Sequence, residues 1–190
     1  MVTPRSQRVL EFMASTARQE LVRGGFRFQR TMQITRLSGP TTPASLSVRT
    51  GALRRSIRHE VVQTGRYAYT LIGVIGQGVP YARIHEFGGT IEPKKAKHLA
   101  IPLQRGAKTA FGPSAYPGKL TFIKSKAGNK LLAEVTGRGT RRRIKPVFVL
   151  KKQVVVPARL GFRQTFQQEA QVTLVNIQQK LQVIKMRGGR

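Results

Sequence analysis

The amino-acid sequence predicts an α+β fold: a mostly antiparallel sheet of hairpins with a long N-terminal helix, short central helices and a long C-terminal helix. Apolar residues recur at helical spacing near both ends, whereas the middle alternates with a period of two between turns containing glycine or proline. The 190 residues, 39% of them hydrophobic, suit one domain. We expect a single domain over 1–190, with an N-terminal helical extension at 1–37 and a core at 45–185 that carries a basic loop and hairpin insertion at 104–145.

The first helix is predicted over residues 4–23. Its apolar stripe consists of Leu10, Met13, Ala14, Ala17 and Leu21. Gly24-Gly25 either ends or kinks this helix, or the helix continues through 26–37. The arginines of the segment fit a solvated basic face and direct DNA contact equally well.

A loop is predicted at 38–43 from its turn residues. A short helix should follow at 50–57, because Thr50 can cap its first amides and because Leu53 and Ile57 lie one turn apart. Arginines cover the other sides of this helix.

After that helix the period changes to two, which predicts a hairpin with strands at 60–63 and 67–72. Thr64-Gly65 supplies the turn. Tyr67 and Tyr69 share one face of the second strand. This aromatic pair could stack on nucleic-acid bases, although packing across the strands is the commoner use.

The segment 81–91 carries the most specific pattern in the chain. Pro80 fits the first position of a two-turn helix. A double glycine ends the helix, because glycine adopts a positive φ without a steric clash, and a strand starts at 90–91. The residues expected to serve the fold and a subunit interface, the first three of them on one helical face, are Tyr81, Ile84, His85, Phe87, Gly88 and Gly89.

Within this segment, the adjacent pair His85-Glu86 is the candidate for catalysis. A zinc-protease helix needs a second histidine three residues after the glutamate, and position 89 is glycine. We therefore expect a half-buried structural histidine and a Glu86 paired with an arginine. No catalytic residue, cofactor or metal ligand is predicted.

Residues 91–103 are expected to return to the sheet after a basic turn at 93–97. Glycine and proline in 104–118 predict an irregular loop with little to bury. A second hairpin is expected over 119–135, with its turn at 127–129 and lysines along both strands.

A basic loop flanked by glycines is predicted at 137–143; it lacks the ending of a phosphate-binding nucleotide loop. Residues 147–150 and 154–156 form one last strand or two short ones. Pro157 is expected to open the final helix. The apolar stripe of that helix is Phe162, Phe166, Ala170, Leu174, Ile177, Leu181 and Ile184.

The remaining surface of the final helix is rich in glutamine. These residues are Gln164, Gln167, Gln168, Gln171, Gln178, Gln179 and Gln182. A neutral face costs less to desolvate than a charged one, so it can be buried against a neighbouring subunit; a plain solvent-exposed face is the alternative.

The charge favours a polyanionic partner. The chain has 35 Lys and Arg against 7 acidic residues, a net charge of +28, and a pI near 11.9. All the acidic residues are Glu and no two adjoin, so a cluster of carboxylates for a hard cation is not expected. The chain has no cysteine, which excludes disulfides and thiolate metal sites. No membrane-spanning or secretory segment is expected.

Four blocks of sequence resemble the tail-completion or virion morphogenesis (neck) proteins of long-tailed bacteriophages. They are RTGALRRSI at 49–57, YARIHEFGGTI at 81–91, KHLAIPL at 97–103 and PAR at 157–159. The resemblance is good over 45–105 and loose over 145–185. It implies a small α+β protein without enzymatic activity that forms a ring in the neck or upper tail.

From this resemblance we expect a ring of roughly six or twelve copies, located in the virion and assembled in the host cytoplasm. Its partners would be the head connector or adaptor and the tail terminator or tail tube, with phage DNA in the lumen. The residues expected to contact DNA or an acidic partner are Arg141, Arg142, Arg143, Lys94, Lys95 and Lys97. The alternative function is a basic architectural or ribosomal-like protein that binds nucleic acid without sequence specificity.

Overall fold

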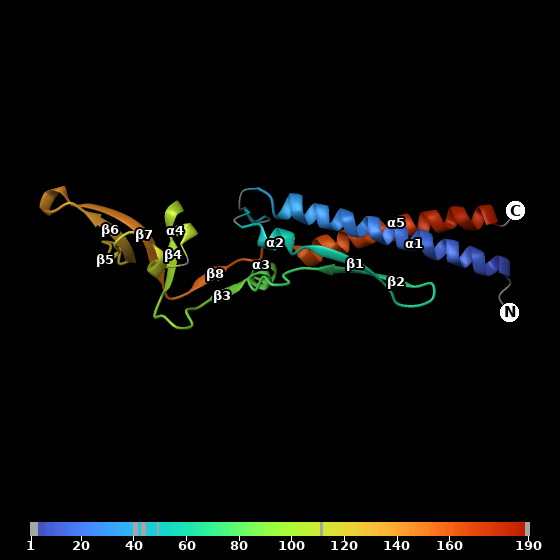
Figure 1. The fold of residues 1–190 in the computed structure, drawn as a ribbon, viewed down its shortest axis with the longest axis horizontal. Coiled ribbons are helices and arrows are strands. Elements are labelled where there is room, and N and C mark those ends of the chain that lie inside the picture. The colour runs from blue at the N-terminus through green and yellow to red at the C-terminus, as the bar shows by residue number, and fades with distance from the viewer. Residues whose placement is uncertain (1–3, 40–41, 43–44, 49, 111, 189–190) are drawn as a thin grey trace. The chain divides into compact units, whose positions relative to one another are not determined.

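The computed structural model describes residues 4–39, 42, 45–48, 50–110 and 112–188. It confirms the predicted class, since 44% of the chain is helical and 25% is strand, with a long helix near each end (Figure 1). The chain divides into two compact units: unit 1 comprises Met1–Gly88 and Pro157–Arg190, and unit 2 comprises Gly89–Val156. The insertion expected at 104–145 falls inside unit 2. Cooperative unfolding of 1–190 as one domain stays a prediction.

Unit 1 contains two long helices, two short ones, a π-helical turn and one hairpin. Its elements are α1 (Pro4–Thr31), the π-helical turn η1 (Met32–Arg36), α2 (Ala52–Arg55), β1 (Arg58–Gln63), β2 (Tyr69–Val74), α3 (Ala82–Phe87) and α5 (Phe162–Gly188). The sequence left open whether the first helix ends or kinks at Gly24-Gly25 or continues beyond it. The helix continues, because α1 runs through both glycines.

Two glycines occupy the middle of α1 at the points where other elements approach the helix closely. A Cβ on Gly24 would overlap the side chain of Thr173 in α5, and a Cβ on Gly25 would overlap the ring of His59 in β1. Glycine costs about 1 kcal/mol relative to alanine inside a helix. Here that cost is offset by the contacts that the missing Cβ permits on both sides of α1.

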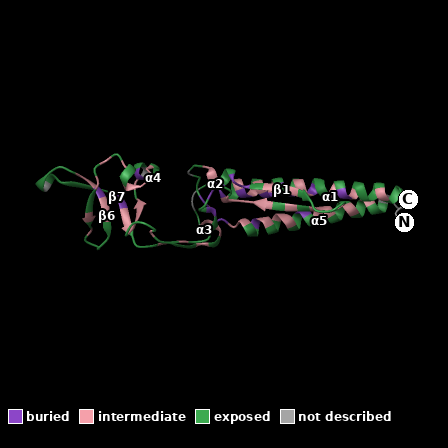
Figure 2. Cartoon of the chain, turned by 60° about the horizontal axis from the view of Figure 1, so that its bottom comes forward, coloured by how far each residue is buried: buried purple, intermediate pink, exposed green. Residues whose placement is uncertain are grey.

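The β1–β2 hairpin packs against α1 and has the predicted antiparallel form, from Arg58 opposite Val74 to Gln63 opposite Tyr69. Gly73 in β2 lies against the ring of Phe166 in α5, so the hairpin also meets the second long helix. The core of unit 1 consists of Phe28, Met32, Leu37, Leu46, Leu53, Ile57, Val79, Ala82 and Leu160. Figure 2 shows these buried residues gathered around α2 and α3, with few near the chain ends.

Unit 2 consists of a four-stranded antiparallel sheet and a separate two-stranded ladder. Its elements are β3 (Gly89–Ile91), β4 (Leu99–Pro102), α4 (Arg105–Thr109), the 3₁₀ turn η2 (Pro113–Ala115), β5 (Thr121–Lys124), β6 (Lys130–Thr136), the 3₁₀ turn η3 (Gly139–Arg141), β7 (Arg143–Lys151) and β8 (Val154–Val156). The sheet order is β4-β7-β6-β5, and β3 pairs with β8. Val147 and Phe148 of β7 and Ala107 of α4 form its buried core.

Three details of the sequence prediction are wrong. Residues 104–118 are not an irregular loop with little to bury, since α4 forms there and Ala107 is buried against the sheet. The last helix begins at Phe162 rather than Pro157, because Leu160 first enters the core and Gly161 turns with φ 62°. Leu174 does not belong to the buried stripe.

The reason for the last error lies in the contact between the two long helices. Thr173 is buried opposite Gly24 and donates a hydrogen bond to the carbonyl of Glu169 at 2.7 Å, while Leu174 is 49% exposed. A small polar residue is therefore the one that fits against α1, and the larger apolar neighbour turns outward. Hydrophobicity alone could not predict this choice.

Candidate interaction surfaces

Residues 81–87 meet the segment 157–163 at the start of α5. The carbonyl of His85 accepts hydrogen bonds from the amides of Arg159 at 2.8 Å and Leu160 at 2.9 Å. The carboxylate of Glu86 accepts from the amides of Phe162 at 2.8 Å and Arg163 at 3.0 Å. Glu86 thus caps the positive end of a 27-residue helix.

This α3–α5 junction corrects one expectation and confirms another. Glu86 is not paired with an arginine side chain; it binds two backbone amides. The double glycine does end α3, with φ 70° at Gly88 and 147° at Gly89, conformations that other residues rarely adopt. Glu86 is thus engaged as a helix cap.

The His85 side chain is half-buried, as predicted, and lies beside the Tyr81 ring at 6.0 Å between centroids. Burial lowers the pKa of His85, and the charge of Arg159 lowers it further, so the ring is neutral at physiological pH. Phe87 is exposed and lies 4.8 Å from the guanidinium of Arg163. Tyr81 is also exposed, whereas Ile84 is half-buried.

Several carboxylates are engaged inside the fold. Glu20 is buried on α1 and accepts from Lys180 of α5 at 2.5 Å and from Arg23 at 2.6 Å. The hydrogen bond from Lys180 is the main reason that the pKa of Glu20 is lowered. Glu169 of α5 likewise accepts from Thr31 of α1 at 3.0 Å. These carboxylates tie α1 to α5 and leave most of the positive charge unneutralised.

The six basic residues predicted to contact DNA or an acidic partner are all exposed and lie in unit 2. The structure does not bring them together as one patch. Arg143 begins β7, whereas Leu99, which follows Lys94, Lys95 and Lys97, pairs with Lys151 at the other end of that strand. Since a strand rises about 3.3 Å per residue, roughly 25 Å separates the two ends of β7. They form two basic ends, one around 141–143 and one around 94–97.

The outer surface of α5 carries a face without charge, which we call the neutral α5 face. In residues 164–179 every exposed side chain is glutamine, valine or leucine. These residues are Gln164, Gln167, Gln168, Gln171, Val172, Leu174, Val175, Gln178 and Gln179. The glutamines were predicted to share this surface. That Val172 and Val175 also lie on this surface was not predicted from the sequence. The sequence does contain the signal, because the two valines are three residues apart and neither belongs to the predicted apolar stripe.

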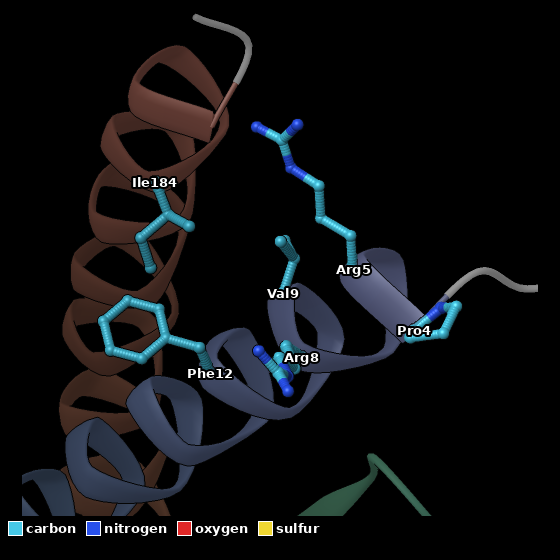
Figure 3. Close-up of a pocket in the computed structure, with 6 residues that line it drawn as sticks. All are labelled: Pro4, Arg5, Arg8, Val9, Phe12 and Ile184. Atoms are coloured by element: carbon cyan, nitrogen blue, oxygen red, sulfur yellow. The ribbon is translucent and has the colours of Figure 1, made fainter.

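A second surface that the sequence did not indicate lies at the open end of the helix pair, between the start of α1 and the end of α5. It is an open groove of about 560 Å³, lined by Pro4, Arg5, Arg8, Val9, Phe12 and Ile184 (Figure 3). Only a residue from the far end of the chain closes its second side, so no local pattern could have revealed it.

No family model, curated protein or solved structure matches this chain. Among the described residues, no group of three or more side chains could hold a metal ion. None of the described helices combines the length and apolar character needed to cross a bilayer.

Proposed function

We propose that this protein is a structural virion protein of the phage neck or upper tail, which forms a homo-oligomeric ring that joins the head connector to the tail and completes the tail. The observation that carries the proposal is the neutral α5 face. Copies of a chain with a net charge of +28 repel each other over most of their surface. A face that lacks charge and exposes Val172 and Val175 at 49% and 48% is where they can meet.

The α3–α5 junction supports a structural rather than a catalytic role. The most specific residues of the chain, His85 and Glu86 among them, are used to bind backbone amides and to start α5. In the proposed ring, the exposed Tyr81 and Phe87 beside the junction contact the neighbouring subunit.

The two basic ends of unit 2 supply the contacts with polyanions. Arg141, Arg142 and Arg143 at one end and the lysines of 94–97 at the other reach either the DNA phosphates in the lumen or acidic surfaces of adjacent rings. The proposed partners are the head connector or adaptor and the tail terminator or tail tube. The protein acts in the virion after assembly in the host cytoplasm.

The decisive experiment is an averaged electron-microscopy map of the virion neck, into which units 1 and 2 are fitted separately. We expect a ring of copies between connector and tail. Absence of the chain from every ring of the particle would refute the proposal and favour the alternative, an architectural protein that binds nucleic acid without sequence specificity.

A variant tests the carrying observation directly. Val175→Lys places a charge in the neutral α5 face and should shift the oligomer toward monomer in light scattering coupled to size exclusion. Val155→Lys is the matched control, because Val155 is also exposed, at 69%, but lies in β8 of unit 2, away from that face. Equal loss of assembly in both variants would argue against the neutral α5 face as the contact.

A further inference from the structure

The open end of the helix pair combines apolar and cationic side chains in one groove. Figure 3 shows the ring of Phe12 extending from α1 toward α5 on the side of Ile184, with Val9 and Arg5 on the α1 side of the gap. Phe12 is 60% exposed, so a large aromatic ring remains in contact with solvent. A neighbouring apolar surface would remove it from water at a gain of about 25 cal/mol per Å².

Farther along the pair, the absence of a side chain at Gly24 allows close contact with Thr173 of α5, whereas residues 4–23 contain no glycine. The spacing of helices follows the size of the side chains between them.

The rim of the groove is cationic. Within the described part of the chain, neither Arg5 nor Arg8 has a carboxylate at ion-pair distance, and the first turn of α1 contains no acidic residue. Positive charge beside an apolar floor is complementary to a segment that carries carboxylates next to apolar residues.

We propose that this groove binds an acidic amphipathic helix of another protein. Arg5, Val9 and Phe12 follow one another along one side of α1 and span eight residues, a rise of about 10 Å, which is two turns of a docked helix. An apolar residue of the partner would sit among Val9, Phe12 and Ile184, with a carboxylate one turn away at Arg5 or Arg8.

Two other occupants fit less well. Duplex DNA would satisfy the arginines but offers no apolar surface to Phe12 and Ile184. The same end of a second copy would bring like charges together, since Arg5 and Arg8 would face their own equivalents. The inference does not depend on a ring or a virion, and it goes beyond the proposed function by naming a separate site and the chemistry of its ligand.

The test uses fluorescent helical peptides that share one leucine stripe and carry glutamate, glutamine or lysine beside it. At physiological ionic strength we expect the glutamate peptide to bind most tightly and the lysine peptide least. Phe12→Ala should weaken binding of the glutamate peptide about tenfold. Its matched control is Phe26→Ala, because Phe26 is equally exposed on α1, at 61%, but outside the groove.

The charge requirement is tested with two double variants of equal net charge. Arg5→Glu with Arg8→Glu should weaken binding of the glutamate peptide about tenfold. Arg18→Glu with Arg30→Glu, both exposed on α1 outside the groove, should change this affinity little. Duplex DNA should respond equally to both pairs. Far-UV circular dichroism verifies that every variant is folded.

Three results would overturn the proposal: unchanged peptide affinity in Phe12→Ala, equal weakening by the two arginine pairs, or binding that does not depend on glutamate. Loss of binding to phosphatidylglycerol vesicles in Phe12→Ala, without peptide binding, would identify a lipid surface instead. Val175→Lys leaves the groove intact, so failure of the ring and failure of this site are distinguishable.

Discussion

Unit 1 takes its core from both ends of the chain, whereas unit 2 builds its core within one continuous segment. Phe28 of α1 lies between Phe162 and Phe166 of α5, with both ring pairs at 5.1 Å between centroids. In unit 2, Phe148 packs with Val147 and with Ala107 from the same segment. Closing the long loop of unit 1 costs chain entropy before its contacts form, so unit 2 can fold earlier and separately.

Both units use glutamates inside their own folds, since Glu134 of unit 2 pairs with Lys145 at 3.5 Å and accepts a hydrogen bond from Tyr116. Unit 1 engages Glu20, Glu86 and Glu169 in ties between its own elements. The exposed basic residues predicted for polyanion contact all lie in unit 2. In the proposed function, unit 1 supplies the subunit contacts and unit 2 the contacts with polyanions.

The largest expected effects come from the two buried phenylalanines. Phe28→Ala and Phe148→Ala each remove a fully buried ring and should lower the free energy of unfolding of their own unit by about 3–5 kcal/mol. Hydrogen exchange measured by mass spectrometry should show faster exchange in α1 and α5 for the first variant and in β6 and β7 for the second.

Exchange that rises equally in both units for either variant would contradict independent cores. It would instead support the sequence-based prediction of one cooperative domain over 1–190.

A smaller effect is expected from the cap of α5. Glu86→Ala leaves the amides of Phe162 and Arg163 without their acceptor and should lower the stability of unit 1 by about 1–2 kcal/mol. Urea unfolding followed by helical circular dichroism measures this loss. Glu92→Ala, at an exposed glutamate of unit 2, is the control and should leave the helical transition unchanged. A loss of the same size in both variants would show that the cap contributes nothing specific.

The smallest effects concern pH, and their signs differ between the units. Burial lowers the pKa of His59 and of His85 in unit 1. As the pH falls below 6.5, the ordinary pKa of histidine, the unfolded chain binds protons that the folded one does not, so the stability of unit 1 falls until the folded pKa is passed. Burial and a hydrogen bond to Glu134 raise the pKa of Tyr116 in unit 2. Above pH 10.0 the unfolded chain therefore loses a proton that the folded chain keeps, so the stability of unit 2 falls as the pH rises.

Unfolding midpoints across the pH range test both signs. Far-UV circular dichroism reports mainly on α1 and α5 and should show the loss on the acid side. Tyr116→Phe should remove the alkaline loss from unit 2 and leave the acid-side behaviour of unit 1 as it was. An alkaline loss of equal size in that variant would exclude Tyr116 as its source.

The sequence by itself determined the local elements of this protein. The helix and double glycine at 81–91 and the hairpin that turns at 127–129 were predicted because their signals are local: a positive φ that glycine tolerates, or a period of two on either side of a turn. The helices near the chain ends were predicted for the same reason, as were the half-buried state of His85 and the glutamines on the surface of α5. Their predicted apolar stripes were only partly right, because Leu10 and Leu174 are exposed.

Only the tertiary structure decided which distant residues meet. Nothing in the sequence indicates that Glu86 caps α5, that Gly24 receives Thr173, or that Ile184 completes a groove with Phe12. The two basic ends of unit 2 are separated for a similar reason, because the register of β4 on β7 sets their distance. Periodicity specifies the faces of an element, whereas the partner of each face depends on how elements far apart in the chain pack together.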